Sequence, residues 1–396
     1  MAQPSKATAD LWIANTVSDL VQGDVREHLP LERIPLQGDV LGLGTTTSLD
    51  NGELSFLLKG DGNTAIWKCQ ASDGSIRELQ PGDGSGHFPY VCFSGDATNL
   101  RRPVDLTLLG PSRGRPLQEL VGEAIALLRS SGELAEAPIY GLRLVARWQS
   151  LIITVASKLC MGQQRRNSSL VSNSLVSSSP VSNSPASSSG AARAAERSIY
   201  DQLQHYRLAE TDNGNSTDPI RFLGRSLQWD CCGFWDTDPC QGRVTVPGAA
   251  NHLHLHGCST DLLHGGHLHH EHPGTALLEL ERLTLYPLQR LHQLGSDLTI
   301  EQLRYDDGEV RFVVVNRGSL DVSDVGVAVV IDDCYSSHRY LRLPWMEAGA
   351  SEDFALPLNL TAGNRCIAVI ADPEHDILEQ DNGRRNNRAV LNLTVA

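Results

Sequence analysis

The sequence of 396 residues carries a formal net charge of −14 and contains 40% hydrophobic and 20% charged residues. A chain of this length exceeds what one hydrophobic core usually organises, so we expect two domains. An acidic surface repels polyphosphate and anionic lipid, and we therefore expect neither nucleic acid nor a membrane as a partner. Nine cysteines without regular spacing and no apolar leader segment favour a cytoplasmic, reducing location, with export left open.

The first 160 residues indicate a strand-dominated α+β fold. A helix is expected over 11–22, and helical spacing of apolar residues returns over 116–129. A long apolar run over 142–159 contains several charged residues and indicates a buried strand. Between the helices, alternating segments separated by Gly-rich and Asp-rich turns predict strands over 38–47, 53–59, 64–70 and 90–93.

A serine-rich segment interrupts the first domain. Residues 168–189 are mostly Ser with Asn, Val and Pro, and short units such as Val-Ser-Asn-Ser repeat within them. Such a composition cannot bury enough apolar surface to fold. We interpret 161–195 as a disordered insert within a domain that spans 1–290.

The C-terminal hundred residues predict a β-sandwich domain over 297–396. Seven short strands are expected, at 298–305, 310–316, 326–332, 336–343, 351–358, 364–371 and 389–395. Together with Val313 to Gly318, Ala371-Asp372-Pro373 and Asn386-Asn387, they resemble a CARDB-type, immunoglobulin-like module. The resemblance implies a binding or spacer unit, for which a protein or a glycan is the expected partner.

Eight of the fourteen histidines fall between residues 252 and 272. His252, His254 and His256 alternate with other residues, so on a strand all three imidazoles would share one face. His267 follows a Gly265-Gly266 turn that would bring the next strand alongside. Two strand histidines and His267 would give a zinc site with one open position, which is typical of catalytic zinc. The alternatives are a surface metal buffer and water-exposed strand histidines.

Several short motifs follow one another along the chain. They are Gly38-Asp39, Gly42-Leu43-Gly44-Thr45, Leu49 to Leu54, Ile139 to Arg143, Gly233-Phe234-Trp235, Val246-Pro247-Gly248, His-x-His and Gly265-Gly266-His267. In this order they resemble bacterial acetolactate decarboxylases, and the resemblance covers residues 11 to 288. It implies a mixed sheet or barrel lobe and a zinc-dependent decarboxylase that converts 2-acetolactate to acetoin.

The resemblance also implies roles for individual residues. His267 matches a zinc ligand, and the strand pair is either His254 with His256, which we prefer, or His252 with His254. Glu53 matches the family's glutamate and would deliver a proton. The alternative is that Glu53 is an exposed glutamate of a turn, without a role in the reaction. The family's arginine for the substrate carboxylate has no counterpart, and Arg143 and Arg147 are the candidates to replace it.

Three functions follow as hypotheses. The first is the decarboxylase, acting on a small 2-hydroxy-3-oxo acid with Zn²⁺ and no organic cofactor. The second is a catalytically degenerate, metal-binding protein that acts as an interaction module through its C-terminal domain. The third is a histidine-rich metal store. A homodimer is left open as the assembly.

Overall fold

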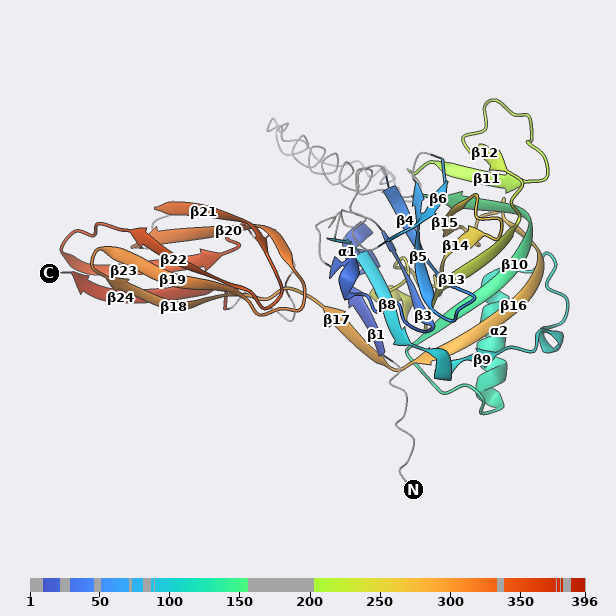
Figure 1. The fold of residues 1–396 in the computed structure, drawn as a ribbon, viewed down its shortest axis with the longest axis horizontal. Helices are drawn as coiled ribbons and strands as arrows, with labels where there is room; N and C mark the ends of the chain where they lie inside the picture. The colour runs from blue at the N-terminus through green and yellow to red at the C-terminus, as the bar shows by residue number, and fades with distance from the viewer. Residues whose placement is uncertain are drawn as a thin grey trace, which may run out of the picture. The chain divides into compact units, whose positions relative to one another are not determined.

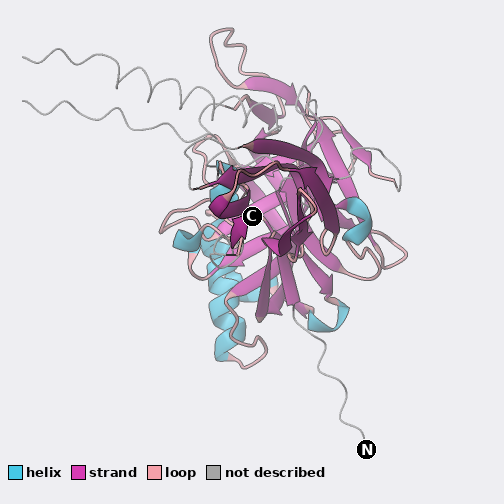
Figure 2. Ribbon diagram, turned by 90° about the vertical axis from the view of Figure 1, so that its left-hand side faces the viewer, coloured by secondary structure: helices cyan, strands magenta, loops and turns pink. Residues whose placement is uncertain are grey.

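The computed structural model describes residues 10–21, 29–45, 51–70, 73–80, 87–88, 90–155, 203–332, 338–374, 376–377, 379 and 386–395. The serine-rich segment at 161–195 lies outside these residues. Strands predominate over helices in the described chain (Figure 2), which confirms the strand-dominated α+β fold class. No helix in the described ranges combines the length and the apolar character needed to cross a membrane.

The chain divides into two compact units, with the main boundary between Leu291 and His292; the short strand at Leu29–Pro30 is grouped with the second unit. The first unit contains a seven-stranded sheet, here called the first sheet, with strand order β17-β1-β8-β3-β4-β5-β6 (Figure 1). Its strands are β1 (Asp10–Ala14), β3 (Val40–Thr45), β4 (Asn51–Leu58), β5 (Thr64–Gln70), β6 (Ile76–Glu78), β8 (Tyr90–Asp96) and β17 (Arg290–Leu294).

The second sheet of this unit has eight strands and curls back on itself. Its main order is β12-β11-β10-β13-β14-β15, with β16 and β9 attached, and β15 also pairs with the end of β10. The long strand β10 therefore contacts both ends of the β13-β14-β15 run. The strands are β9 (Arg102–Pro103), β10 (Ile139–Thr154), β11 (His205–Ala209), β12 (Arg221–Gly224), β13 (Gln228–Asp236), β14 (Leu253–Ser259), β15 (Gly265–Leu268) and β16 (Ala276–Leu288).

The second sheet packs on both faces. One face contacts helix α2 (Leu117–Ser130), whose apolar stripe joins Leu142, Leu144 and Leu255 in one core. The opposite face meets strands β3 and β4 of the first sheet. Because the side chains of a strand alternate between faces, every second residue of β10 and β14 lies between the two sheets.

The remaining elements of the structure are short. They are α1 (Val17–Val21), the 3-10 helices η1 (Leu31–Arg33), η2 (Thr98–Leu100), η3 (Leu106–Leu109) and η5 (Pro239–Gln241), and the strands β2 (Leu29–Pro30) and β7 (His87–Phe88).

The helix expected over 11–22 is wrong in its first half. Residues Asp10–Ala14 form strand β1, which pairs with β8, and only Val17–Val21 are helical. Asn15 separates the two elements with a φ of +63°, a left-handed conformation that Asn tolerates better than most residues. Pairing with β8 and burial of Leu11 and Ile13 outweigh the helical spacing of the apolar residues.

Among the described residues from 298 to 395, seven strands form two sheets, as the sequence predicts. One sheet has the order β18-β19-β22 and the other β21-β20-β23-β24, and fifteen buried apolar residues form their common core. The strands are β18 (Leu298–Asp306), β19 (Glu309–Asn316), β20 (Val322–Ile331), β21 (Arg339–Met346), β22 (Ser351–Pro357), β23 (Gly363–Ala371) and β24 (Arg388–Val395).

Candidate metal centre

The β14-β15 hairpin brings three histidines together. His254 and His256 are two residues apart on β14 and lie on the same face, and His267 on β15 is the direct cross-strand partner of His256. Gly265 and Gly266 give β15 the close approach it needs. A Cβ on Gly266 would lie 2.7 Å from the carbonyl oxygen of Thr154 on β10, so a larger residue would push β15 away.

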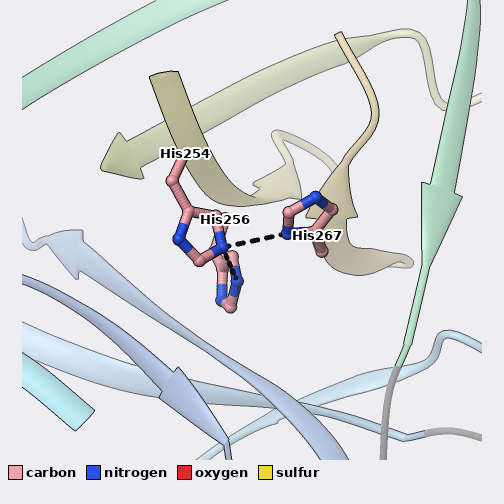
Figure 3. A group of neighbouring side chains, drawn as sticks. All are labelled: His254, His256 and His267. Atoms are coloured by element: carbon pink, nitrogen blue, oxygen red, sulfur yellow. Dashed lines mark hydrogen bonds between the residues drawn. The ribbon is translucent and has the colours of Figure 1, made fainter. Parts of the chain in front are cut away.

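The three imidazoles converge on a common point (Figure 3). His254 Nε2 lies 3.0 Å from His267 Nδ1 and 3.2 Å from His256 Nε2. One ligand atom from each residue lies within 4.8 Å of the other two, and within the described part of the chain this is the one such group of three or more potential ligands. Tetrahedral zinc with Zn–N bonds of about 2.0–2.1 Å needs nitrogens roughly 3.3 Å apart, close to this spacing.

Backbone carbonyls orient two of the three rings. His254 Nδ1 lies 2.6 Å from the oxygen of Val244, and His256 Nδ1 lies 2.9 Å from the oxygen of Leu54. A carbonyl oxygen only accepts, so each Nδ1 carries the proton and each Nε2 presents a lone pair. Two lone pairs facing one another at 3.2 Å repel unless a cation lies between them, and this arrangement of outer partners is typical of metal-binding histidines.

The same burial keeps the rings neutral. Burial lowers the pKa of His254 to about 4. Burial, together with the neighbouring imidazoles, also holds the pKa of His256 and of His267 well below the usual value. Neutral imidazole is the form that binds a metal ion, so the group needs no deprotonation near neutral pH.

Glu53 and Thr45 complete the surroundings of the histidine group. Glu53, on β4, is only 2% exposed, and its carboxylate lies 3.7 Å from His256 Nε2. Its cross-strand partner on β3 is Thr45, whose buried hydroxyl has no hydrogen-bond partner among the described residues. The sequence points to Glu53 but not to Thr45, because only the β3-β4 register places this threonine beside the glutamate.

A cavity of about 640 Å³ reaches His254 and His267. Its wall includes the start of α2, the 246–251 loop and a second set of histidines, and none of the described residues lining it is arginine or lysine. The lining residues are Pro116, Gln118, Glu119, His205, Val246, Ala250, Asn251, Leu253, His254, His267, His269, His270, Glu271, His272 and Pro273.

The other histidines of the cluster have different partners. His252 lies before β14; its ring stacks on Trp235 with centroids 4.9 Å apart, and its Nδ1 lies 2.7 Å from the oxygen of Asp236. The expectation that it shares the face of the other two is therefore wrong, and it is not part of the three-histidine group. His269 lies between Glu271 and the Thr154 hydroxyl, at 2.9 Å from each.

Neither arginine candidate lies free to bind a substrate carboxylate, which corrects the expectation from the sequence. Arg143 is 6% exposed and donates hydrogen bonds to Asp39 and to two backbone carbonyls. Arg147 is about half exposed and forms an ion pair with Glu281 at 3.0 Å. Neither side chain lines the cavity.

Comparison with family models and with characterised proteins gave no match. Among solved structures, the chain is similar to alpha-acetolactate decarboxylase from Bacillus subtilis strain 168, with 15% identity over 72% of this chain and 88% of that one and a TM-score of 0.42. The enzyme from Bacillus subtilis subspecies spizizenii gives 15% identity, the same coverage and a TM-score of 0.41. A CARDB domain from Pyrococcus furiosus, solved with di-metal ions, is 19% identical over 26% of this chain and 90% of that one, with a TM-score of 0.23. In each case the likeness is one of fold alone.

Proposed function

We propose that this protein is a zinc-dependent decarboxylase that converts 2-acetolactate, a 2-hydroxy-3-oxo acid, to acetoin and CO₂. The observation that carries the proposal is the buried group of His254, His256 and His267, with Glu53 beside it and a cavity leading to it. The choice of substrate comes from the resemblance of the ordered motifs to those of acetolactate decarboxylases. Under this proposal the three imidazoles bind zinc. The protein then produces acetoin in the cytoplasm.

The substrate, the metal and Glu53 each have a role in the proposed reaction. Zinc supplies a Lewis acid for negative charge on substrate oxygens when it is bound. Loss of CO₂ leaves an electron pair on the former C2 of the substrate, and this pair moves into the adjacent carbonyl to give an enediolate. Glu53 is the proton donor in this proposal, because its carboxyl is the acidic group held against the histidines. Acetoin forms when that proton reaches carbon.

Burial assists the proton transfer in two ways. Glu53 and His256 are both buried, so few water molecules compete as proton donors. The Thr45 hydroxyl is buried and has no hydrogen-bond partner in the described ranges, and in this proposal it contacts an oxygen of the substrate beside Glu53. Hydrogen bonds of this kind fix the face of the substrate that receives the proton.

A degenerate, metal-binding interaction protein is the second candidate, and one observation favours it. Arg143 and Arg147 are both engaged elsewhere, and none of the described lining residues of the cavity is a permanent cation for the substrate carboxylate. In this alternative, the CARDB-like unit provides the interaction with a protein or a glycan.

One experiment separates the candidates. The full chain is purified, its bound metal is counted, and acetoin release from racemic acetolactate is measured before chelation, after chelation and after zinc is restored. One zinc per chain with chelator-sensitive release supports the decarboxylase. One zinc without release selects the interaction protein, and several weakly held ions per chain select a metal store.

A further inference from the structure

Arg143 lies on the same row of the second sheet as the metal group. It pairs across the sheet with Cys232, Cys232 pairs with His256, and His256 pairs with His267. Paired residues project from the same face of a sheet, so this whole row faces the first sheet. Arg143 is therefore a buried cation within the layer that contains the three histidines, although it does not reach their cavity.

The guanidinium of Arg143 donates hydrogen bonds to two strands of the first sheet. Its Nε donates to Asp39 at 2.7 Å, its Nη1 to the oxygen of Phe56 on β4 at 2.7 Å, and its Nη2 to the oxygen of Val40 on β3 at 2.8 Å. The pairing of β3 with β4 ends at Leu43 and Ser55. Arg143 thus connects both strands to the second sheet just beyond the point where their own ladder stops.

The part of β4 that Arg143 contacts also contains two groups of the metal centre. Leu54, two residues before Phe56, accepts the hydrogen bond from His256 Nδ1 that turns the Nε2 lone pair inward. Glu53, the preceding residue, places its carboxylate 3.7 Å from that same Nε2. A shift of β4 away from the second sheet would therefore have two effects at once: it would break the hydrogen bond that orients the His256 ring, and it would move the Glu53 carboxylate.

We propose that Arg143 is a positioning residue that acts through β4 on the metal centre, and that it keeps both the Leu54 carbonyl and the Glu53 carboxylate in place against His256. The inference rests on the proposed function for the identity of the metal. Its physical basis is the planar fork of arginine, which reaches three acceptors in fixed directions, whereas the single ammonium of lysine cannot.

Arg101 offers a matched control for this proposal. It also pairs with Asp39, through Nε at 2.6 Å, but among the described residues it donates no hydrogen bond to β4 or to β3. An Arg101→Lys variant therefore changes a partner of the same buried carboxylate, while the hydrogen bond from Arg143 to the Phe56 carbonyl is kept. A difference in zinc binding between the two lysine variants is therefore due to the contacts of Arg143 with β3 and β4, and not to the ion pair with Asp39.

The test compares full-length Arg143→Lys, Arg101→Lys and wild-type protein, each checked for folding by circular dichroism. Zinc affinity is measured by competition with a chelator, and the visible absorption spectrum is recorded after loading with Co²⁺. We expect Arg143→Lys to lose about 10–100-fold in zinc affinity, the cost typical of disturbing an outer partner of a ligand, and to change the Co²⁺ spectrum. Arg101→Lys should match wild type in both.

Two results would overturn the inference: zinc affinity and Co²⁺ spectrum unchanged in Arg143→Lys, or the same loss in both lysine variants. If Arg143→Lys fails to fold, the pair Asp39→Leu with Arg143→Met removes the fork without leaving an unpaired buried charge, and the same loss of affinity is expected of it. Wild-type protein that binds neither ion contradicts the proposed function itself, which keeps the two failures distinct.

Discussion

His267 and His252 differ sharply at the scale of the single residue, although both belong to one histidine-rich segment. His267 Nδ1 faces His254, whereas the ring of His252 stacks on Trp235. We expect His267→Ala to lower zinc affinity by more than the roughly 10–100-fold typical of an outer partner, because it removes a direct ligand. His252→Ala should keep wild-type affinity. Chelator competition measures both, and equal losses would contradict the assignment of the ligands.

Under the proposed function, a substitution at Glu53 distinguishes proton transfer from metal binding. Replacement by Gln preserves the shape of the side chain but removes the acid, so we expect Glu53→Gln to retain zinc and to lose about 10²–10⁴-fold in the rate of acetoin release. Glu119→Gln changes a carboxyl that lines the cavity; it serves as the control and should keep most of the rate. A Glu53→Gln variant with undiminished turnover would remove this residue from the mechanism.

Asp39 couples stability to pH through its buried cluster. Burial acts to raise the pKa of this carboxyl, but the charge of Arg143 and hydrogen bonds from Arg143, Arg101 and Tyr286 outweigh it, and the pKa falls below the usual 3.8. Stabilisation by the ionised carboxylate is thus complete above about pH 3.8 and is lost as the pH falls through the lower pKa of the folded state.

For the Asp39→Asn variant we expect a loss of about 3–5 kcal/mol in the free energy of unfolding at pH 7, because Arg143 is left as a buried charge without its partner. The gap between wild type and variant should narrow as the pH falls below 3.8. Urea unfolding at a series of pH values measures it. A gap that stays constant down to pH 2 would show that Asp39 is not the titrating group.

The sequence could predict the group of three histidines only in part. The two-residue spacing identifies the face shared by His254 and His256, and Gly265-Gly266 predicts the return of His267. The exclusion of His252 depends on where β14 begins and on the stacking partner Trp235, which comes from another strand. The engagement of Arg143 with Asp39 could not be foreseen either, because the two residues are 104 positions apart.

At the scale of the element, regular strands were the easier part to predict. The range expected for the strand at 64–70 agrees with β5, and all seven strands of the C-terminal unit are present. The helix expected at 11–22 was wrong in its first half, because that half pairs with β8, a strand far along the chain. Curling of the second sheet, which closes β15 onto β10, likewise depends on long-range pairing that local patterns do not encode.

Gly233 tests the contact between β13 and β14. A Cβ at this position would lie 2.0 Å from the carbonyl oxygen of His254, and neither backbone can move without separating the two strands. We expect Gly233→Ala to cost about 1–3 kcal/mol of stability and to weaken zinc binding, because His254 shifts with β14. The control is Gly60→Ala, where a Cβ would meet nothing within 4 Å. Chemical unfolding and chelator competition would show both effects, and a Gly233→Ala protein with wild-type zinc affinity would contradict them.

At the scale of the whole molecule, each unit has a hydrophobic core of its own. Leu120 is fully buried in the core that α2 shares with the second sheet, and Ile367 is fully buried in the core of the C-terminal sandwich. Substitution of either by Ala removes several buried carbons and should cost about 2–5 kcal/mol in the unit that contains it. Because each core stabilises its own unit, the two losses should be felt in different parts of the chain.

Hydrogen–deuterium exchange read by mass spectrometry distinguishes the two variants. Ile367→Ala should speed exchange in peptides from β20 and β23 and leave β14 and β15 protected, with zinc retained at the wild-type level. Leu120→Ala should do the reverse and weaken zinc binding, since β14 packs through Leu255 in the same core as the helix. Faster exchange of β14 in Ile367→Ala would mean that the metal centre depends on the C-terminal unit for its stability, and that the two cores do not act separately.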